Sequence, residues 1–172
     1  FSSIVIEYAG GSLALTAVCT ALIVWIVGLA VPVTASYIIC AVIAAPALIT
    51  LGVPDFAAHM FIFYYALLSE VSPPTALSCF AAAAITGADP YKTTLQAWKY
   101  TMPAFVVPFF FVLDPMGTGV LLQLPKGANW AEVAWVVFLI FVAIAALAAG
   151  LQGWLLKKTT LLERALLVVA GA

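Results

Sequence analysis

The feature that most constrains this chain is a pair of long apolar stretches without a single charged residue. The first runs from Ser12 to Val31 and the second from Thr34 to Leu51. A helix needs about 20 predominantly apolar residues to cross the hydrocarbon core of a bilayer. Of all residues, 66% are hydrophobic and 8% are charged, whereas soluble domains carry about 25% charged residues. The sequence therefore predicts an all-α, polytopic integral membrane protein.

Charge and cysteine content argue against several other classes of protein. The formal net charge of −1 argues against nucleic acid as a partner, because binding of nucleic acid needs a basic patch. The cysteines Cys19, Cys40 and Cys79 lie singly inside apolar runs. No pair has the spacing of metal ligands, so we interpret them as small buried hydrophobic residues. We expect no cofactor.

The rest of the chain alternates between apolar segments and polar links. We expect apolar segments at 56–68, 75–86, 101–113 and 130–156, an interfacial helix at 91–99, a loop at 114–129, a polar link at 159–164 and a further span from Ala165. Lys and Arg residues gather at 92–99 and at 157–164, two clusters that the spans place on one side of the membrane. An excess of these residues marks the cytoplasmic side. The loop 114–129 then faces the periplasm, and Lys126 is the exception.

Two breaks rich in Gly, Ser and Pro interrupt the apolar segments. One lies at residues 28–32 and the other at residues 69–74. In the second break Ser72 and Pro73 are both disfavoured from the α region, because a proline follows each of them. Irregular backbone survives at membrane depth only where it faces protein or a polar cavity. Paired breaks of this kind indicate the binding site of a secondary transporter, although a proline is also tolerated as a simple kink.

Hydroxyl groups flank both breaks. Oxygen atoms at a broken helix suit a small hard cation such as Na⁺, and half-helix N-termini favour an anionic group of a substrate. We therefore predict a substrate and ion site from residues of the two breaks, namely Gly28, Pro32, Thr34, Ser36, Ser69, Glu70, Ser72, Pro73, Pro74 and Thr75. The expected Na⁺ ligands are Thr34, Ser36, Ser72 and Thr75. We predict no catalytic residue.

Glu70 and His59 are ionisable residues with more than one interpretation. Glu70 lies between two apolar runs, and an ionisable group inside the membrane is functional by default. The alternative is a structural carboxylate held by a lysine elsewhere. His59 follows Asp55 by four residues near a helix start, where the carboxylate can hold it. We interpret His59 as structural, with a proton relay as the alternative.

Five segments, taken in order, resemble a known family. They are residues 28–37 (GLAVPVTASY), 57–65 (AAHMFIFYY), 68–76 (LSEVSPPTA), 85–90 (ITGADP) and 104–109 (AFVVPF). The set resembles the large membrane subunit of tripartite ATP-independent periplasmic (TRAP) transporters, and within it the fused permease that works with TAXI-type binding proteins. The resemblance covers residues 1 to about 115 well and the remainder loosely.

The resemblance implies the C-terminal portion of an elevator-type secondary transporter in a bacterial or archaeal inner membrane. Residues 1–90 would be a transport-domain half-repeat with two broken helical segments. Residues 91–172 would hold the interfacial helix, two transmembrane helices and the start of a further segment. Such permeases take up organic acids or amino acids, usually driven by a sodium gradient. The expected partners are a periplasmic TAXI-type binding protein, a small anionic substrate, the remainder of the permease chain and the bilayer.

The sequence departs from that family at two positions. Dicarboxylate and sialic acid relatives usually carry an Asp after the first break, where this chain has Pro32 or Val33, so an acidic function is not transferred there. Many relatives have a small apolar residue at the position of Glu70, so Na⁺ and H⁺ both stay open as the coupling ion. Whether residues 12–50 form a re-entrant hairpin or two spans also stays open.

Two functions from other classes compete with transport. An intramembrane enzyme would need an acid–base set, and Glu70 and His59 are the only plausible members. A non-catalytic helical scaffold subunit of a membrane complex would need no site at all. Gradient-driven uptake in liposomes that depends on a binding protein separates transport from both.

The charge pattern predicts the orientation of the chain. Single cysteines at positions 92, 157 and 158 should be protected from an impermeant thiol reagent added outside, and a cysteine at position 129 should react with it. Labelling in intact cells measures this. Strong labelling at 158 with none at 129 would show that the orientation is reversed.

Overall fold

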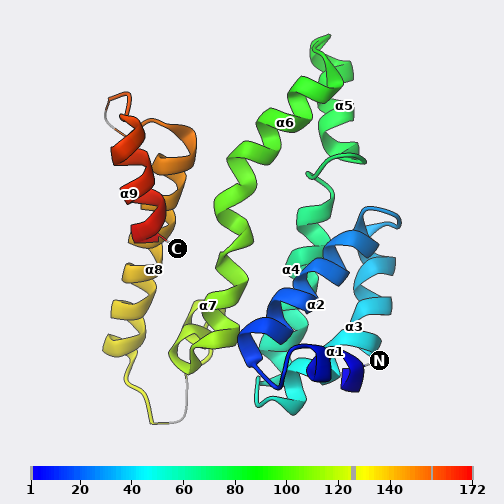
Figure 1. Ribbon diagram of the computed structural model, residues 1–172, viewed down its shortest axis with the longest axis vertical. Coiled ribbons are helices and arrows are strands. Elements are labelled where there is room, and N and C mark those ends of the chain that lie inside the picture. Colours follow the sequence, from blue (N-terminus) through cyan, green and yellow to red (C-terminus); the bar gives the residue numbers. More distant parts are fainter. Residues whose placement is uncertain (1, 125–126, 156, 172) are drawn as a thin grey trace. The chain divides into compact units, whose positions relative to one another are not determined.

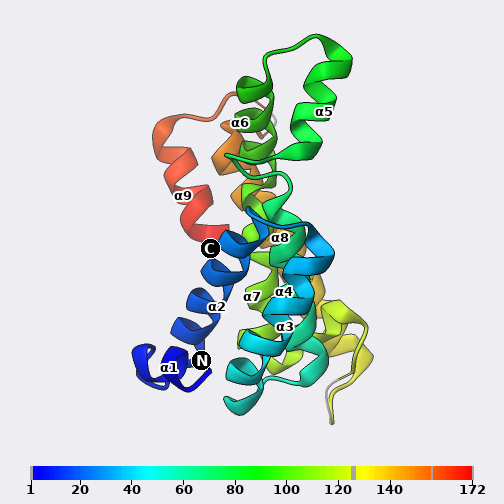
Figure 2. The same cartoon turned by 90° about the vertical axis from the view of Figure 1, so that its right-hand side faces the viewer.

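The computed structural model describes residues 2–124, 127–155 and 157–171. The elements named in this part of the chain are all helices, labelled in Figure 1 and seen from the side in Figure 2. In chain order they are α1 (Ser2–Tyr8), α2 (Leu13–Gly28), α3 (Val33–Thr50), α4 (Asp55–Ser69), α5 (Leu77–Thr86), α6 (Pro90–Thr101), the 3₁₀ helix η1 (Met102–Phe105), α7 (Val107–Leu113), the 3₁₀ helix η2 (Pro115–Leu121), α8 (Trp130–Gln152) and α9 (Leu161–Gly171). The chain forms two compact units, residues 1–98 and residues 99–172, whose boundary lies inside α6.

Two of the described helices are long and apolar enough to cross a membrane, judged by length and composition. They are α3, with 18 residues, and α8, with 23 residues. Large side chains on both helices are exposed, including Val42 on α3 and Phe141 on α8. A soluble core helix would bury such side chains, whereas lipid solvates them as readily as protein does. The helical architecture is therefore compatible with insertion into a bilayer.

The first unit is built on a helical hairpin. α2 and α3 pack against each other and both pack against α4, as Figures 1 and 2 show. The buried face of α2 includes Thr16, Thr20, Val24 and Gly28, which recur every fourth residue. Small residues at this spacing let the backbones of membrane helices approach closely. Close packing of small side chains, rather than a layer of large ones, thus holds the hairpin on α4.

α4 and α5 are two halves of an interrupted apolar helix. α4 has 15 residues and α5 has 10, so the halves are about 22 and 15 Å long at 1.5 Å per residue. Neither half alone crosses a hydrocarbon core of about 30 Å. The polar link between them, residues 70–76, therefore falls at membrane depth if the pair spans the bilayer.

An aromatic contact joins α3 to α4. The Tyr37 hydroxyl lies 3.2 Å from His59 Nδ1, and the Tyr37 ring meets Phe63 edge-on with ring centroids 5.7 Å apart. The sequence suggested that Asp55 holds His59, but among the described residues its hydrogen-bond partner is Tyr37. His59 thus takes part in the contact between α3 and α4 within the first unit.

The second unit contains the antiparallel pair α8 and α9. Asn129 and Glu132 form a capping box at the start of α8. Thr160 and Glu163 do the same for α9: the Thr160 amide donates to the Glu163 carboxylate at 2.7 Å. That bond holds the pKa of the exposed Glu163 carboxyl below its ordinary value. α8 ends at Gln152, and the next residue, Gly153, has a left-handed φ of 74°, which favours glycine.

The boundaries of this unit differ from the sequence prediction in three places. The expected loop at 114–129 contains the 3₁₀ helix η2, which Asp114 caps by accepting from the Met116 amide. The span expected over 130–156 stops at Gln152, because Gly153 reverses the backbone. α9 begins at Leu161, four residues before Ala165, because the capping box at Thr160 already starts a helix inside the expected polar link.

Gly150 is a point of close packing between α8 and α9 at which a substitution can be tested. A Cβ at this position would lie 2.8 Å from Val168 Cγ2 and 3.0 Å from the Arg164 carbonyl oxygen. We expect Gly150→Leu to force α9 away from α8 and to lower the free energy of unfolding by about 1–3 kcal/mol. Thermal unfolding in detergent measures the loss. Ala145→Leu, on the exposed side of α8, is the matched control, and equal effects of the two substitutions would contradict the packing.

Candidate functional site

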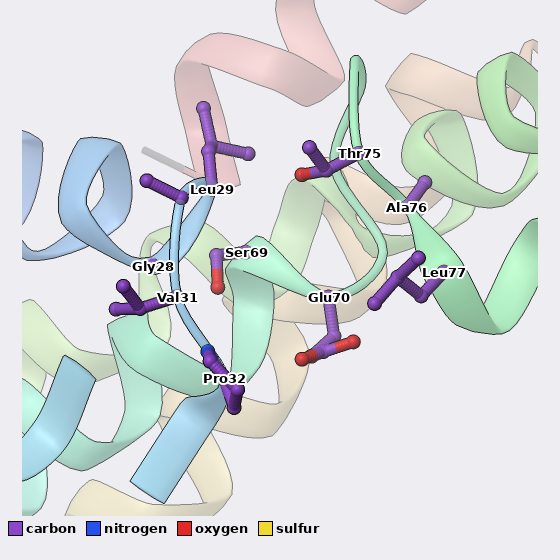
Figure 3. A pocket seen from close by; sticks show the side chains of 10 residues that line it. Gly28, Leu29, Val31, Pro32, Ser69, Glu70, Thr75, Ala76 and Leu77 are labelled. Atoms are coloured by element: carbon purple, nitrogen blue, oxygen red, sulfur yellow. The ribbon is translucent and has the colours of Figure 1, made fainter. Parts of the chain in front are cut away.

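The two sequence breaks meet at one cavity in the first unit. The cavity has a volume of about 210 Å³ and is lined by residues 28–32 from the first break and by Ser69, Glu70 and residues 75–77 from the second. Figure 3 shows the turn at 28–32 facing Ser69 and Glu70 at the end of α4, with Thr75 and Leu77 on the returning chain. Segments about 40 positions apart in the sequence are thus brought to a common site by the packing of α2 and α3 on α4.

Four helix ends surround this cavity. Residues 28–32 join the C-terminus of α2 to the N-terminus of α3, and residues 69–77 join the C-terminus of α4 to the N-terminus of α5. Helix N-termini carry free N–H groups and partial positive charge, whereas C-termini carry free carbonyls and partial negative charge. The N-cap residues Pro32 and Ala76 supply no side-chain hydrogen bond to these N–H groups. The cavity therefore offers donors for an anion and acceptors for a cation side by side.

Three lining residues stand four positions before a proline. Gly28, Ser69 and Glu70 precede Pro32, Pro73 and Pro74 at this spacing, so their carbonyls lack the donor that continues an α-helix. The Ser69 carbonyl accepts instead from the Ser72 amide at 3.1 Å, and the Glu70 carbonyl accepts from the Ser78 hydroxyl at 3.0 Å. Among the described residues, no backbone amide donates to the Gly28 carbonyl. That oxygen is one of the backbone acceptors left at the site.

Gly28 is required at the hairpin turn by close packing. A Cβ on Gly28 would lie 2.8 Å from Ser69 Cβ, closer still to Ser69 Oγ, and 3.3 Å from Ser36 Oγ. The Ser69 hydroxyl itself donates to the Ala66 carbonyl at 2.7 Å, which fixes its direction along α4. The absence of a side chain at Gly28 therefore lets the hairpin turn reach the break in the second helix.

The structure separates the ten residues predicted from the sequence into two sets. Five line the cavity: Gly28, Pro32, Ser69, Glu70 and Thr75. Five do not. Ser36 is buried beside Gly28, and Ser72 is buried and donates to the Leu68 carbonyl at 2.7 Å. Pro73 and Pro74 lie in the link between α4 and α5, and Thr34 is exposed on α3.

Sequence reasoning missed several residues, both at the cavity and farther along α2. Leu29, Ala30, Val31, Ala76 and Leu77 line the cavity, and they contribute backbone and apolar surface that no side-chain pattern reveals. Thr16 and Thr20 on α2 have fully buried hydroxyls without a hydrogen-bond partner among the described residues. Their spacing of four in an apolar helix was the available signal. No group of three or more His, Cys, Asp or Glu side chains in the described ranges is placed to hold a metal ion.

Comparison with known families decides the class of the protein. Residues 1–115 match the model of the tripartite ATP-independent periplasmic transporter DctM component. The chain belongs to this family. The DctM component is a membrane part of a TRAP secondary transporter rather than an enzyme, and it works with a substrate-binding protein and a small membrane component. No curated protein and no solved structure matched the chain.

The match to the DctM component covers the whole site. Residues 28–32 and 69–77 both lie within the matched range, as do all helices of the first unit. The α8–α9 pair lies outside it. The cavity thus belongs to the part of the chain that is shared with transporter components.

The close approach of Gly28 to Ser69 can be tested by a double-mutant cycle. Gly28→Ala should lower the free energy of unfolding by about 1–3 kcal/mol because its Cβ overlaps Ser69. Ser69→Gly removes the atoms that would be struck, so Gly28→Ala should cost much less in that background. Thermal unfolding of the four proteins in detergent gives the coupling, which we expect to be about 1–2 kcal/mol. Additive effects would show that the two residues do not meet.

Proposed function

We propose that the cavity is the ion and substrate site of a TRAP permease that takes up a small organic anion with Na⁺. The observation that supports it most directly is the presence of four helix ends at one cavity. Broken helices with this arrangement bind an anionic substrate group at their N-termini and a cation at their C-termini. The substrate would be an organic acid or amino acid delivered by a periplasmic TAXI-type binding protein.

Carbonyl and hydroxyl oxygens of the site suit Na⁺, a hard cation. The Gly28 carbonyl lacks a described amide donor, and the Thr75 side chain lines the same cavity. Glu70 adds a carboxylate, which would strengthen cation binding by its charge. Ser36 and Ser72 are buried next to the two breaks. They would stabilise the two turns without lining the cavity.

The anion would bind at the opposite helix ends. The first turns of α3 and α5 have no side-chain cap, so their N–H groups are free to meet a carboxylate. These turns begin at Val33 and Leu77, each next to or within the cavity lining. A carboxylate held there would lie beside the cation, which partly neutralises it.

The mechanism would be of the elevator type, in an inner membrane with multiple spans. The hairpin α2–α3 has legs of 16 and 18 residues, and α2 is about 24 Å long. α2 alone falls short of the hydrocarbon core, whereas α3 is long enough to cross it. We take the hairpin to be re-entrant because its turn meets the break after α4 at one cavity. A hairpin turn against a broken helix is a unit that can move as one body with its cargo.

Glu70 supports proton coupling as a second candidate. It is half-buried at the C-terminus of α4 and lines the cavity. A carboxyl group in that place could take a proton where relatives bind sodium, which is the alternative that the sequence leaves open. The dependence of uptake on each gradient distinguishes the two ions.

Substitution of Thr75 tests the ion site. Thr75→Val keeps the shape of the side chain but removes its oxygen, and a lost ligand should cost about 1–3 kcal/mol. The half-saturating Na⁺ concentration for uptake should therefore rise roughly 5- to 150-fold. The assay measures uptake into liposomes that contain the complete permease, with its binding protein present.

Two further variants make the ion test specific. Thr86→Val is the matched control, since the Thr86 hydroxyl donates to the Ala82 carbonyl at 3.0 Å away from the cavity. If the carboxylate binds Na⁺ through its charge, Glu70→Gln should raise the half-saturating Na⁺ concentration. If protons are coupled, Glu70→Gln should abolish the proton-driven component of uptake. Unchanged Na⁺ and substrate dependence in both Thr75→Val and Glu70→Gln would show that the cavity is not the ion site.

A further inference from the structure

A second cavity lies in the other unit, between α8 and α9. Its volume is about 520 Å³, and its lining combines apolar side chains of both helices with one charged residue, Arg164. On α9, Leu161, Ala165 and Val169 line it at a spacing of four residues. That spacing forms an apolar strip along one side of the helix. The strip suits an extended apolar chain better than a small polar ligand.

Arg164 is held in position at the end of this cavity. Its Nε donates to the Gly150 carbonyl at 3.0 Å and its Nη2 donates to the Leu151 carbonyl at 3.3 Å. These carbonyls belong to the last turns of α8, where a cation is favourable. A guanidinium group has five N–H donors, so the two bonds orient the group and leave donors for an anion. The side chain is also exposed, so an anion can reach it.

The link between α8 and α9 adds positive charge to the same region. Lys157 and Lys158 lie in this link and both are exposed. Glu163 is the one carboxylate nearby in sequence. It accepts from the Thr160 amide and interacts electrostatically with Lys157, so the region keeps a net positive charge from Arg164 and the two lysines. Trp154, which is 55% exposed at the end of α8, is typical of the interface between membrane and water. An apolar groove thus ends in a cationic region at that interface.

We propose that the groove between α8 and α9 binds an anionic phospholipid. One acyl chain would lie along Leu161, Ala165 and Val169, and the phosphate would meet the free N–H donors of Arg164. Basic pockets between membrane helices bind anionic head groups in this way. A free phosphate ion would use the guanidinium alone and leave the apolar volume empty. The proposal is independent of the proposed transport site, whose cavity lies in the first unit.

Lipid retention by the complete purified protein tests the proposal. The protein is exchanged into detergent with phosphatidylglycerol or with phosphatidylcholine of the same acyl chains, washed, and examined by native mass spectrometry. We expect phosphatidylglycerol to be retained at least about fivefold better, as one effective cation at the head group would give. Inorganic phosphate at millimolar concentration should not displace it, because the acyl chain contributes to binding.

Variants separate the two parts of the site. Arg164→Gln and the double variant Lys157→Gln/Lys158→Gln should each reduce the preference for phosphatidylglycerol about fivefold or more, and the double variant leaves the helix contacts of Arg164 in place. Ala165→Phe should fill the groove and lower retention of both lipids. Lys92→Gln, which removes one positive charge in the first unit as Arg164→Gln does in the second, is the control. Equal retention of both lipids, displacement by phosphate alone, or full retention in Ala165→Phe would each overturn the proposal.

Discussion

Backbone groups that lose their helical partners have no water to bond inside a bilayer, and this cost shapes the first unit. Pro32, Pro73 and Pro74 cannot donate to the carbonyls four residues before them. These carbonyls belong to Gly28, Ser69 and Glu70, and all three residues line one cavity. The fold therefore gathers its interrupted backbone in one place. Local donors satisfy two of the carbonyls, which concentrates the remaining polarity at the hairpin turn.

That gathering depends on residues that are small rather than strongly hydrophobic. Lipid is as apolar as a leucine side chain, so apolar surface alone does not drive membrane helices together. The stripe on α2 from Thr16 to Gly28 brings its backbone close to α4. At its end, Gly28 meets Ser69 without room for a Cβ. The same interaction that packs the helices thus places one break against the other, and the site follows from the packing of the hairpin.

The two breaks could be recognised in the sequence, but their proximity in the fold could not. Proline pairs and Gly–Pro turns are local signals, so the ends of α4 and α5 could be predicted to within a few residues. Side-chain direction is not local in this sense. Thr34 and Ser36 stand two apart on α3, which places them on different sides of a helix with about 3.6 residues per turn, and only Ser36 is buried. Ser72 turns inward because the Leu68 carbonyl accepts its hydroxyl. The early start of α9 was visible in the Thr160–Glu163 spacing, but the polar composition of the link concealed it.

In the proposed site, helix ends of opposite polarity line one cavity, and this arrangement would couple the ion to the substrate. Opposite unit charges about 4 Å apart attract by about 4 kcal/mol at an effective dielectric constant of 20, and such coupling is reciprocal between the two ligands. Glu70 lines the same cavity, and its negative charge would oppose an anionic substrate until a cation neutralises it. The cation would therefore bind first and the substrate second. A cavity of about 210 Å³ lies below the range of about 300–1,000 Å³ typical of ligand pockets, so it would hold the charged group of the substrate and leave its specificity to surfaces beyond these residues.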